Sequence, residues 1–178
     1  MTGPAERPWG ADRPRPRLLI LGIGNVLLRD EGLGVHVVRA LAEDPGRLPD
    51  GTAFLDGGTL GLDLLPEIAE ADALLLVDAV RLRDRPGAVR VIHGKEIHAT
   101  LAGHISPHQV GVADLVAAAR LLGCLPERVS LVAMQPAAIQ VGLELSAPVA
   151  AALPLAISTA QEESWRLAGD HEASAIAG

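Results

Sequence analysis

The chain has very few aromatic residues and a single cysteine. Its 178 residues include one phenylalanine, two tryptophans and no tyrosine. A surface that stacks nucleic-acid bases needs exposed aromatic rings, so this composition argues against a base-stacking function. Cys124 cannot form an intramolecular disulfide, which fits a reducing compartment. It has no basic neighbour in the sequence, and we expect it to be a small packed hydrophobe rather than a nucleophile.

Positive charge and long apolar runs are also scarce. The 15 Lys and Arg are outnumbered by 22 Asp and Glu, for a formal charge of -7. This balance argues against binding to nucleic acid or anionic membrane. No stretch approaches the ~20 apolar residues that span a bilayer. The run Leu18–Leu28 after the Arg-rich and Pro-rich start is interrupted by Gly22 and Gly24 and lacks a cleavage site, so it is not a signal peptide. We therefore expect a cytoplasmic protein.

The length and the 49% hydrophobic content fit one globular domain. At this size roughly 70% of the surface of the unfolded chain can be buried, so no disulfide or structural metal is required. We expect a single domain over residues 17–168. A disordered Pro-rich extension over 1–16 precedes it and a flexible tail over 169–178 follows it.

Buried-strand patterns alternate with helical periodicities along the chain. Apolar runs predict five strands, at 18–22, 52–56, 73–78, 88–92 and 129–134. Helices are predicted from residue 32 to about 45, at 60–70, at 106–123 and at 148–167, with Pro154 kinking the last one or delaying its start. This alternation is typical of a mostly parallel sheet with helices on both faces.

The predicted start of the third helix carries a capping box. Ser106 is placed as the N-cap, Pro107 as the first helical residue, and Gln109 stands three residues after the serine. His108 therefore falls in a first helical turn, where the helix dipole keeps its imidazole neutral. Neutral imidazole is the form that binds metal or accepts a proton.

Acidic residues follow three of the predicted strands. Glu31 closes the glycine-containing loop after the first strand, and Asp56 and Asp78 end the second and third. Because the carboxyl ends of parallel strands meet at one edge of a sheet, we expect these carboxylates and His108 to face one crevice. Two carboxylates and a neutral imidazole suit a first-row divalent metal such as nickel or zinc.

Each residue also has a purely structural interpretation. Asp30 could cap a helix and Glu31 could favour the positive end of its dipole. Asp56 precedes two glycines and could form a turn, whereas no capping pattern follows Asp78. The other histidines lack metal-ligand spacing and are expected on the surface or in loops: His36, His93, His98, His104 and His171.

Four ordered segments resemble the nickel-iron hydrogenase maturation endopeptidases. They are Gly22-Ile-Gly-Asn-Val-Leu-Leu-Arg-Asp-Glu-Gly32, Asp56-Gly-Gly-Thr-Leu-Gly61, Val77-Asp-Ala79 and Ser106-Pro-His-Gln109. The resemblance covers residues 18 to 134 and, more loosely, the last helix. It implies a three-layer α/β/α sandwich of the phosphorylase/hydrolase-like kind, in which a five-stranded sheet contains one antiparallel strand. The short strand at 88–92 fits that position.

The resemblance also implies a substrate and a set of functional residues. Members of the family remove a short carboxy-terminal extension from the large-subunit precursor of the hydrogenase after nickel has been inserted. The metal-contacting positions fall on Glu31, Asp78 and His108, and the nickel is expected to belong to the substrate. As a mechanistic hypothesis, a carboxylate or a metal-polarised water attacks the scissile carbonyl, with Asp56 as a candidate general base.

The chain departs from the family pattern in its extension of about 16 residues and in the His-rich segment 93–104. Two other interpretations of the sequence stay open. A nucleotide-binding oxidoreductase would use Gly22 and Gly24 around a phosphate, although Leu27 stands where a third glycine is needed and Asp56 lies far beyond the ribose-binding position. A non-catalytic nickel-binding scaffold would use the same Glu31, Asp78 and His108.

Overall fold

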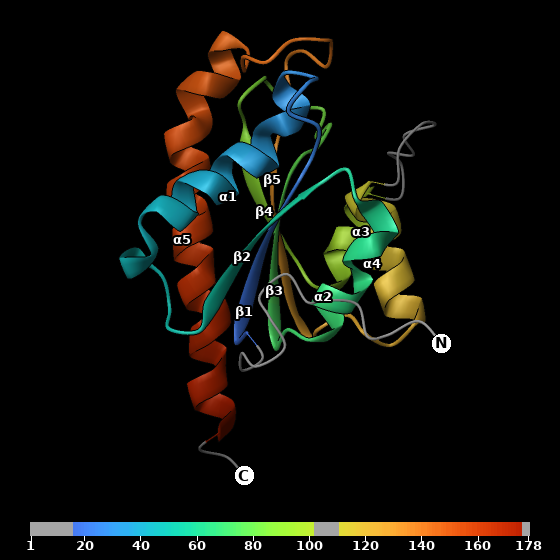
Figure 1. The fold of residues 1–178 in the computed structure, drawn as a ribbon, viewed down its shortest axis with the longest axis vertical. Helices are drawn as coiled ribbons and strands as arrows, with labels where there is room; N and C mark the ends of the chain where they lie inside the picture. Colours follow the sequence, from blue (N-terminus) through green and yellow to red (C-terminus); the bar gives the residue numbers. More distant parts are fainter. Residues whose placement is uncertain (1–15, 102–110, 176–178) are drawn as a thin grey trace, which may run out of the picture.

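The computed structural model describes residues 16–101 and 111–175, and its centre is a five-stranded sheet (Figure 1). The order across the sheet is β2-β1-β3-β5-β4. The strands are β1 (Leu18–Ile23), β2 (Thr52–Gly58), β3 (Ala73–Ala79), β4 (Val89–His93) and β5 (Arg128–Met134). β4 pairs antiparallel with β5, and the other neighbouring pairs are parallel. The predicted mostly parallel sheet with one short antiparallel strand is confirmed.

Helices cover both faces of this sheet, as Figure 1 shows. One face packs against α1 (Leu33–Glu43) and α5 (Ala147–Ala175). The other packs against α2 (Leu65–Ala69), α3 (Lys95–Leu101) and α4 (Val112–Leu121). Short 3-10 helices lie in the connections: η1 (Asp30–Gly32), η2 (Pro45–Arg47) and η3 (Gly61–Leu64). The predicted three-layer α/β/α sandwich is confirmed.

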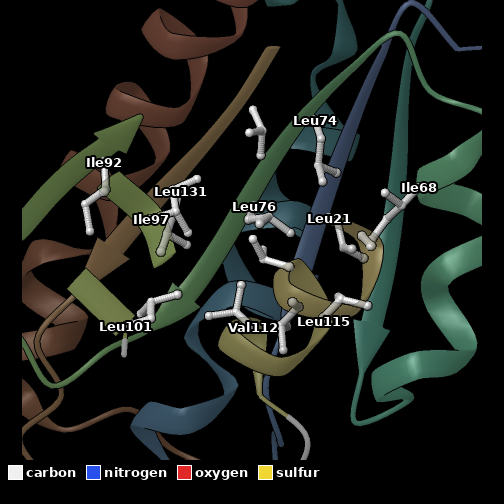
Figure 2. Close-up of a cluster of buried hydrophobic side chains, with 14 of the residues drawn as sticks. Leu21, Ile68, Leu74, Leu76, Ile92, Ile97, Leu101, Val112, Leu115 and Leu131 are labelled. Atoms are coloured by element: carbon white, nitrogen blue, oxygen red, sulfur yellow. The ribbon is translucent and has the colours of Figure 1, made fainter. Parts of the chain in front are cut away.

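Two hydrophobic clusters hold the layers together. Side chains alternate between the faces of a strand, so Leu19 and Leu21 enter one cluster while Leu18 and Ile20 enter the other. Because both of its faces are buried, the central strand β1 is apolar along its whole length, and β3 is apolar up to Asp78. Figure 2 shows the first cluster, in which leucines of the sheet meet side chains of the covering helices. Its labelled members are Leu21, Ile68, Leu74, Leu76, Ile92, Ile97, Leu101, Val112, Leu115 and Leu131.

Glycine allows α1 to cross the sheet at very close range. A Cβ atom on Gly34 would lie 2.2 Å from the carbonyl oxygen of Val77 and 2.4 Å from that of Ile23. A Cβ atom on Gly22 would lie 2.3 Å from the carbonyl oxygen of Gly34. No side chain can be accommodated at these distances, so the two glycines bring the start of α1 directly onto the ends of β1 and β3.

The predicted single helix over 106–123 is wrong, because α4 begins at Val112 and the residue before it is not helical. Gly111 is its N-cap, with an extended backbone at φ -87 and ψ -177, and its N–H donates to the Asp114 carboxylate at 3.2 Å. The sequence thus holds a second capping signal, Gly111 with Asp114, five residues after the one that was chosen. Ser106, Pro107 and Gln109 lie outside the described residues.

Three other helices differ from the prediction. The segment expected as one helix at 60–70 is divided into η3 and α2. α3 lies in the His-rich segment 93–104, for which the sequence pattern predicts no helix. α5 contains Pro154 within a continuous helix and runs to Ala175, into the segment that was assigned to a flexible tail. Within the described part of the chain, no helix is long and apolar enough to cross a membrane.

Candidate active site

The carboxyl ends of β1 and β3 lie side by side at the centre of the sheet. The chain leaves β1 toward α1 on one face, and it arrives at β3 from α2 on the other. Open α/β sheets bind their ligands where the connections change face in this way. Glu31 in η1 and Asp78 near the end of β3 both occupy this position, and η1 packs against β3. The structure therefore brings together two of the predicted site residues.

The loop between β1 and η1 folds tightly on itself. Gly24 has φ +131, and a Cβ atom on it would lie 1.7 Å from the carbonyl oxygen of Glu31. The backbone N–H of Gly24 donates to the carbonyl of Gly58 at 2.9 Å, which ties the loop to the end of β2. Gly24 thus allows the loop to pack against the backbone of Glu31. The carbonyl group of Glu31 occupies the space beside Gly24 that a bound phosphate would need. This arrangement argues against the nucleotide-binding interpretation.

Glu31 and Asp78 are both poorly solvated. Burial raises the pKa of Glu31, and its Oε2 atom is buried without a hydrogen-bond partner in the described residues. Burial also raises the pKa of Asp78 to about 8, opposed by the backbone N–H of Ala79 and reinforced by the nearby Glu31 carboxylate. That N–H donates to Asp78 Oδ1 at 2.7 Å. Two desolvated carboxyl groups that repel each other are suited to receive a cation.

The third predicted contact, His108, lies outside the described residues, so its position relative to Glu31 and Asp78 stays a prediction. In the described part of the chain, no group of three His, Cys, Asp or Glu side chains is placed to hold a metal ion. Two carboxylates alone form an incomplete ligand set that needs donors from elsewhere. Such a set is compatible with recognition of a metal ion that another protein already binds.

Asp56 lies at the same edge of the sheet but on the opposite face. It follows Phe54 in the strand alternation and so points toward the face covered by α1, whereas Asp78 points with Leu76 toward the α4 face. Its carboxylate pairs with Arg39 of α1, with an Nη2 to Oδ2 distance of 2.7 Å. The expectation that Asp56 faces the same crevice as Asp78 is therefore wrong. The sequence could not show this, because a one-residue change of register reverses the face.

Proteins of similar sequence and fold point to one family. A family model described as hydrogenase maturation protease matches residues 35–163. The chain is 39% identical over 142 residues to the hydrogenase 2 maturation protease of Escherichia coli (strain K12), a match that covers 79% of this chain and 86% of that protein. It is 42% identical over 149 residues to the hydrogenase expression/formation protein HupD of Rhodobacter capsulatus, covering 83% and 70% respectively.

Solved structures agree with these matches. The hydrogenase maturating endopeptidase HybD from E. coli superimposes with a TM-score of 0.71 at 37% identity, covering 80% of this chain and 88% of that one. The [NiFe] hydrogenase maturation protease HybD from Thermococcus kodakarensis gives a TM-score of 0.68 at 28% identity, covering 83% and 99%. The chain belongs to the hydrogenase maturation protease family. It is therefore a hydrolase, as the four sequence segments implied.

In this protease, Asp30 has a role that the sequence did not reveal. It was interpreted as a helix cap, but it makes no cap bond and is fully buried. Its carboxylate accepts four hydrogen bonds at 2.7–2.8 Å, from the backbone N–H groups of Ala137 and Ala138 and from the N–H and hydroxyl of Ser146. Burial alone would raise the pKa of Asp30, but these bonds outweigh it and the pKa is lowered.

His36 of the protease also differs from the expectation of a surface or loop residue. It lies in α1 rather than in a loop, and its Nε2 atom is buried without a partner in the described residues. Burial lowers the pKa of His36, Arg39 lowers it further, and Asp56 partly offsets both. The imidazole is thus held neutral beside the Arg39–Asp56 pair, on the α1 side of the sheet.

Proposed function

We propose that this protease removes the carboxy-terminal extension of a nickel-iron hydrogenase large-subunit precursor after nickel insertion. The observation that supports this most strongly is the pair Glu31 and Asp78, two desolvated carboxyl groups at the central carboxyl edge of the sheet. Relatives named as hydrogenase maturation proteases match over most of the chain. The nickel is part of the substrate in this proposal, and the protein acts in the cytoplasm.

Glu31, Asp78 and His108 are proposed to contact the nickel of the precursor. At neutral pH, a pKa of about 8 keeps the Asp78 carboxyl largely protonated. A cation beside it favours the carboxylate, so docking of a nickel-loaded precursor would release this proton. A precursor without the cation would instead meet a protonated Asp78 and an unsatisfied Glu31. The site can thus discriminate between loaded and unloaded precursors by electrostatics.

Contact with the nickel would place the nearby scissile peptide for attack by water or a carboxylate. Asp56 is the candidate for the general base that the sequence suggested. Its pairing with Arg39 and its position on the opposite face weigh against that role. Replacing Asp56 with Asn separates the two possibilities: a general base would be lost with the carboxylate, whereas a structural partner of Arg39 would leave the cleavage rate nearly unchanged.

A purified preparation of the protein incubated with nickel-loaded precursor tests the activity directly. Wild-type protein should release the carboxy-terminal peptide, detected by mass spectrometry, and H108A should fold normally but release none. D78N should also release none, and D63N, at an exposed aspartate in η3, is the matched control that should process normally. Absence of peptide release by wild-type protein would favour the non-catalytic nickel-binding scaffold. Full processing by H108A would remove His108 from the site.

A further inference from the structure

Exposed apolar side chains gather at the carboxyl edge of the sheet. In the described residues, ten large hydrophobic side chains are exposed, and six of them lie in the segments that follow β1, β2 and β5. These six are Leu27, Leu60, Leu62, Ile139, Val141 and Leu143. A soluble chain gains nothing by exposing apolar groups together at one end, so such a concentration marks a contact surface.

Four of these residues belong to two loops that are joined to each other. The loop after β1 and the loop between β5 and α5 meet at the upper end of the molecule in Figure 1. The backbone N–H of Gly142 donates to the carbonyl oxygen of Leu27 at 2.9 Å. The backbone N–H of Arg29 donates to the carbonyl oxygen of Gly142, also at 2.9 Å. Two isolated β-bridges also join the loops, one between Leu28 and Gly142 and the other between Arg29 and Ile139. Leu27, Ile139, Val141 and Leu143 on these loops are called the bridged-loop surface below.

The bridged-loop surface is rigidly supported. The buried Asp30 carboxylate binds both ends of the second loop, at Ala137 and Ala138 on one side and at Ser146 on the other. The Arg29 side chain adds a bond to the carbonyl of Glu144 at 3.1 Å. A surface that is ordered before binding loses less conformational entropy when a partner docks. Val141, with 87% exposure, is thus held out toward solvent by a fixed loop.

The two loops are also free of charge over most of their length. Residues 22–28 and 136–143 contain no Asp, Glu, Lys or Arg, in a chain in which 21% of residues are charged. Depletion of charge is typical of the centre of a protein–protein interface. The chemistry therefore fits an apolar face of a protein, and it does not fit nucleic acid or an anionic membrane.

The surface is continuous with the active site. Glu31 follows Arg29 and Asp30 directly in the chain, so the same turn presents both the carboxylate and the bridged loops. A peptidase must bring part of its protein substrate against its catalytic groups. We propose that the bridged-loop surface docks an apolar face of the hydrogenase precursor beside the cleavage site. This inference rests on the proposed function and names the residues that provide affinity for the protein substrate.

Aspartate substitutions at the surface test the proposal. V141D and L143D place a charge in the interface without removing anything from the core. Each should raise KM for nickel-loaded precursor, and the Kd for the precursor, by about tenfold, while kcat and the melting temperature stay near wild type. L121D is the matched control, because Leu121 is also 87% exposed but lies at the end of α4, away from this edge. Its KM and Kd should not change.

Direct binding, for example by interferometry, separates this proposal from the proposed function. Wild-type protein that binds the precursor but releases no peptide would refute the activity and still allow the docking surface to be tested by Kd. Unchanged KM and Kd in V141D and L143D would overturn the docking proposal, as would an equal loss in L121D. A wild-type dimer that V141D converts to a monomer without changing Kd would assign the surface to a second copy of the chain, and would also overturn it.

Discussion

Single carboxyl groups give this protease two opposite responses to pH. Asp78 is protonated in the folded state up to a pKa of about 8, because burial outweighs the hydrogen bond from Ala79. Asp30 is also buried, but four donors hold its pKa below the ordinary value. The two residues lie at the same edge of the sheet. Asp30 accepts four hydrogen bonds and Asp78 accepts one from Ala79, and this difference in hydrogen bonding contributes to their different charges. Asp30 is a structural anion, whereas Asp78 stays largely protonated at neutral pH.

Replacing Asp78 with Asn should flatten the dependence of stability on pH. Between the ordinary pKa of 3.8 and the folded-state value of about 8, the folded protein binds more protons at this position than the unfolded chain. The free energy of unfolding therefore falls as the pH rises through this window. D78N lacks this contribution, so its loss of stability across the window should be smaller by on the order of a few kcal/mol.

Urea unfolding at about pH 5 and at about pH 8.5 measures this difference. Both conditions lie above the ordinary pKa of an aspartate, so the titration of Asp30 does not contribute. The D63N protein should show the wild-type slope. Parallel pH profiles for wild type and D78N would contradict the raised pKa of Asp78.

Replacing Asp30 with Asn should destabilise the protein strongly at neutral pH. The amide offers one acceptor oxygen to the N–H groups of Ala137 and Ala138 and to Ser146, and its NH2 group meets donors. We expect a loss of about 3 kcal/mol in the free energy of unfolding. Because the pKa of Asp30 is lowered, the difference from wild type should shrink as the pH falls below 3.8 toward the folded-state value. Chemical denaturation across this range, with D63N as a near-neutral control, checks both parts.

At the scale of elements, glycines decide how closely α1 approaches the sheet. G34A should be severely destabilised, by more than about 3 kcal/mol, because its methyl group would overlap the carbonyl oxygens of Val77 and Ile23. G169A is the matched change in a helix with open space, since nothing lies within 4 Å of a Cβ atom there. It should stabilise α5 by about 0.5–1 kcal/mol. Thermal unfolding of the two variants gives the comparison, and equal melting temperatures would refute the close crossing.

The sequence predicted strands better than helices, for a physical reason. The central strands β1 and β3 are buried on both faces, so their apolar runs stand out from the surrounding residues. Helix boundaries depend on competing caps, and the signal at Ser106 obscured the one at Gly111 that begins α4. α3 is a single short helix within a His-rich segment that lacked a clear apolar stripe.

At the candidate site, features that depend on local sequence were predictable, whereas features that depend on long-range contacts were not. The position of Glu31 and Asp78 at one edge of the sheet was predictable, because strand ends and the family segments both mark these residues. The Asp30 partners lie 107 to 116 residues away along the chain, so no local pattern could indicate them. The side on which Asp56 points depended on strand register, and the exposed Val141 lies in a loop without a recognisable motif. These features required the three-dimensional structure.

At the scale of the whole molecule, the sheet serves as a platform with its functions at one edge. The desolvated carboxyl pair, the Asp30 anchor and the bridged-loop surface all follow the carboxyl ends of β1, β3 and β5. Its helices cover both faces and leave this edge to the loops (Figure 1). In the proposed mechanism, a protein substrate contacts the bridged-loop surface and the carboxyl pair at the same time, so that recognition of the polypeptide would be coupled to recognition of its metal.

The most direct test of this account compares processing of nickel-loaded and nickel-free precursor by the same preparation of the protease. Release of the carboxy-terminal peptide is followed by mass spectrometry, with D78N measured in parallel. We predict rapid release from the loaded precursor, little or none from the nickel-free precursor, and none from either by D78N. Equal release from the two precursors, or full activity of D78N, would contradict the claim that Glu31 and Asp78 read the nickel of the substrate.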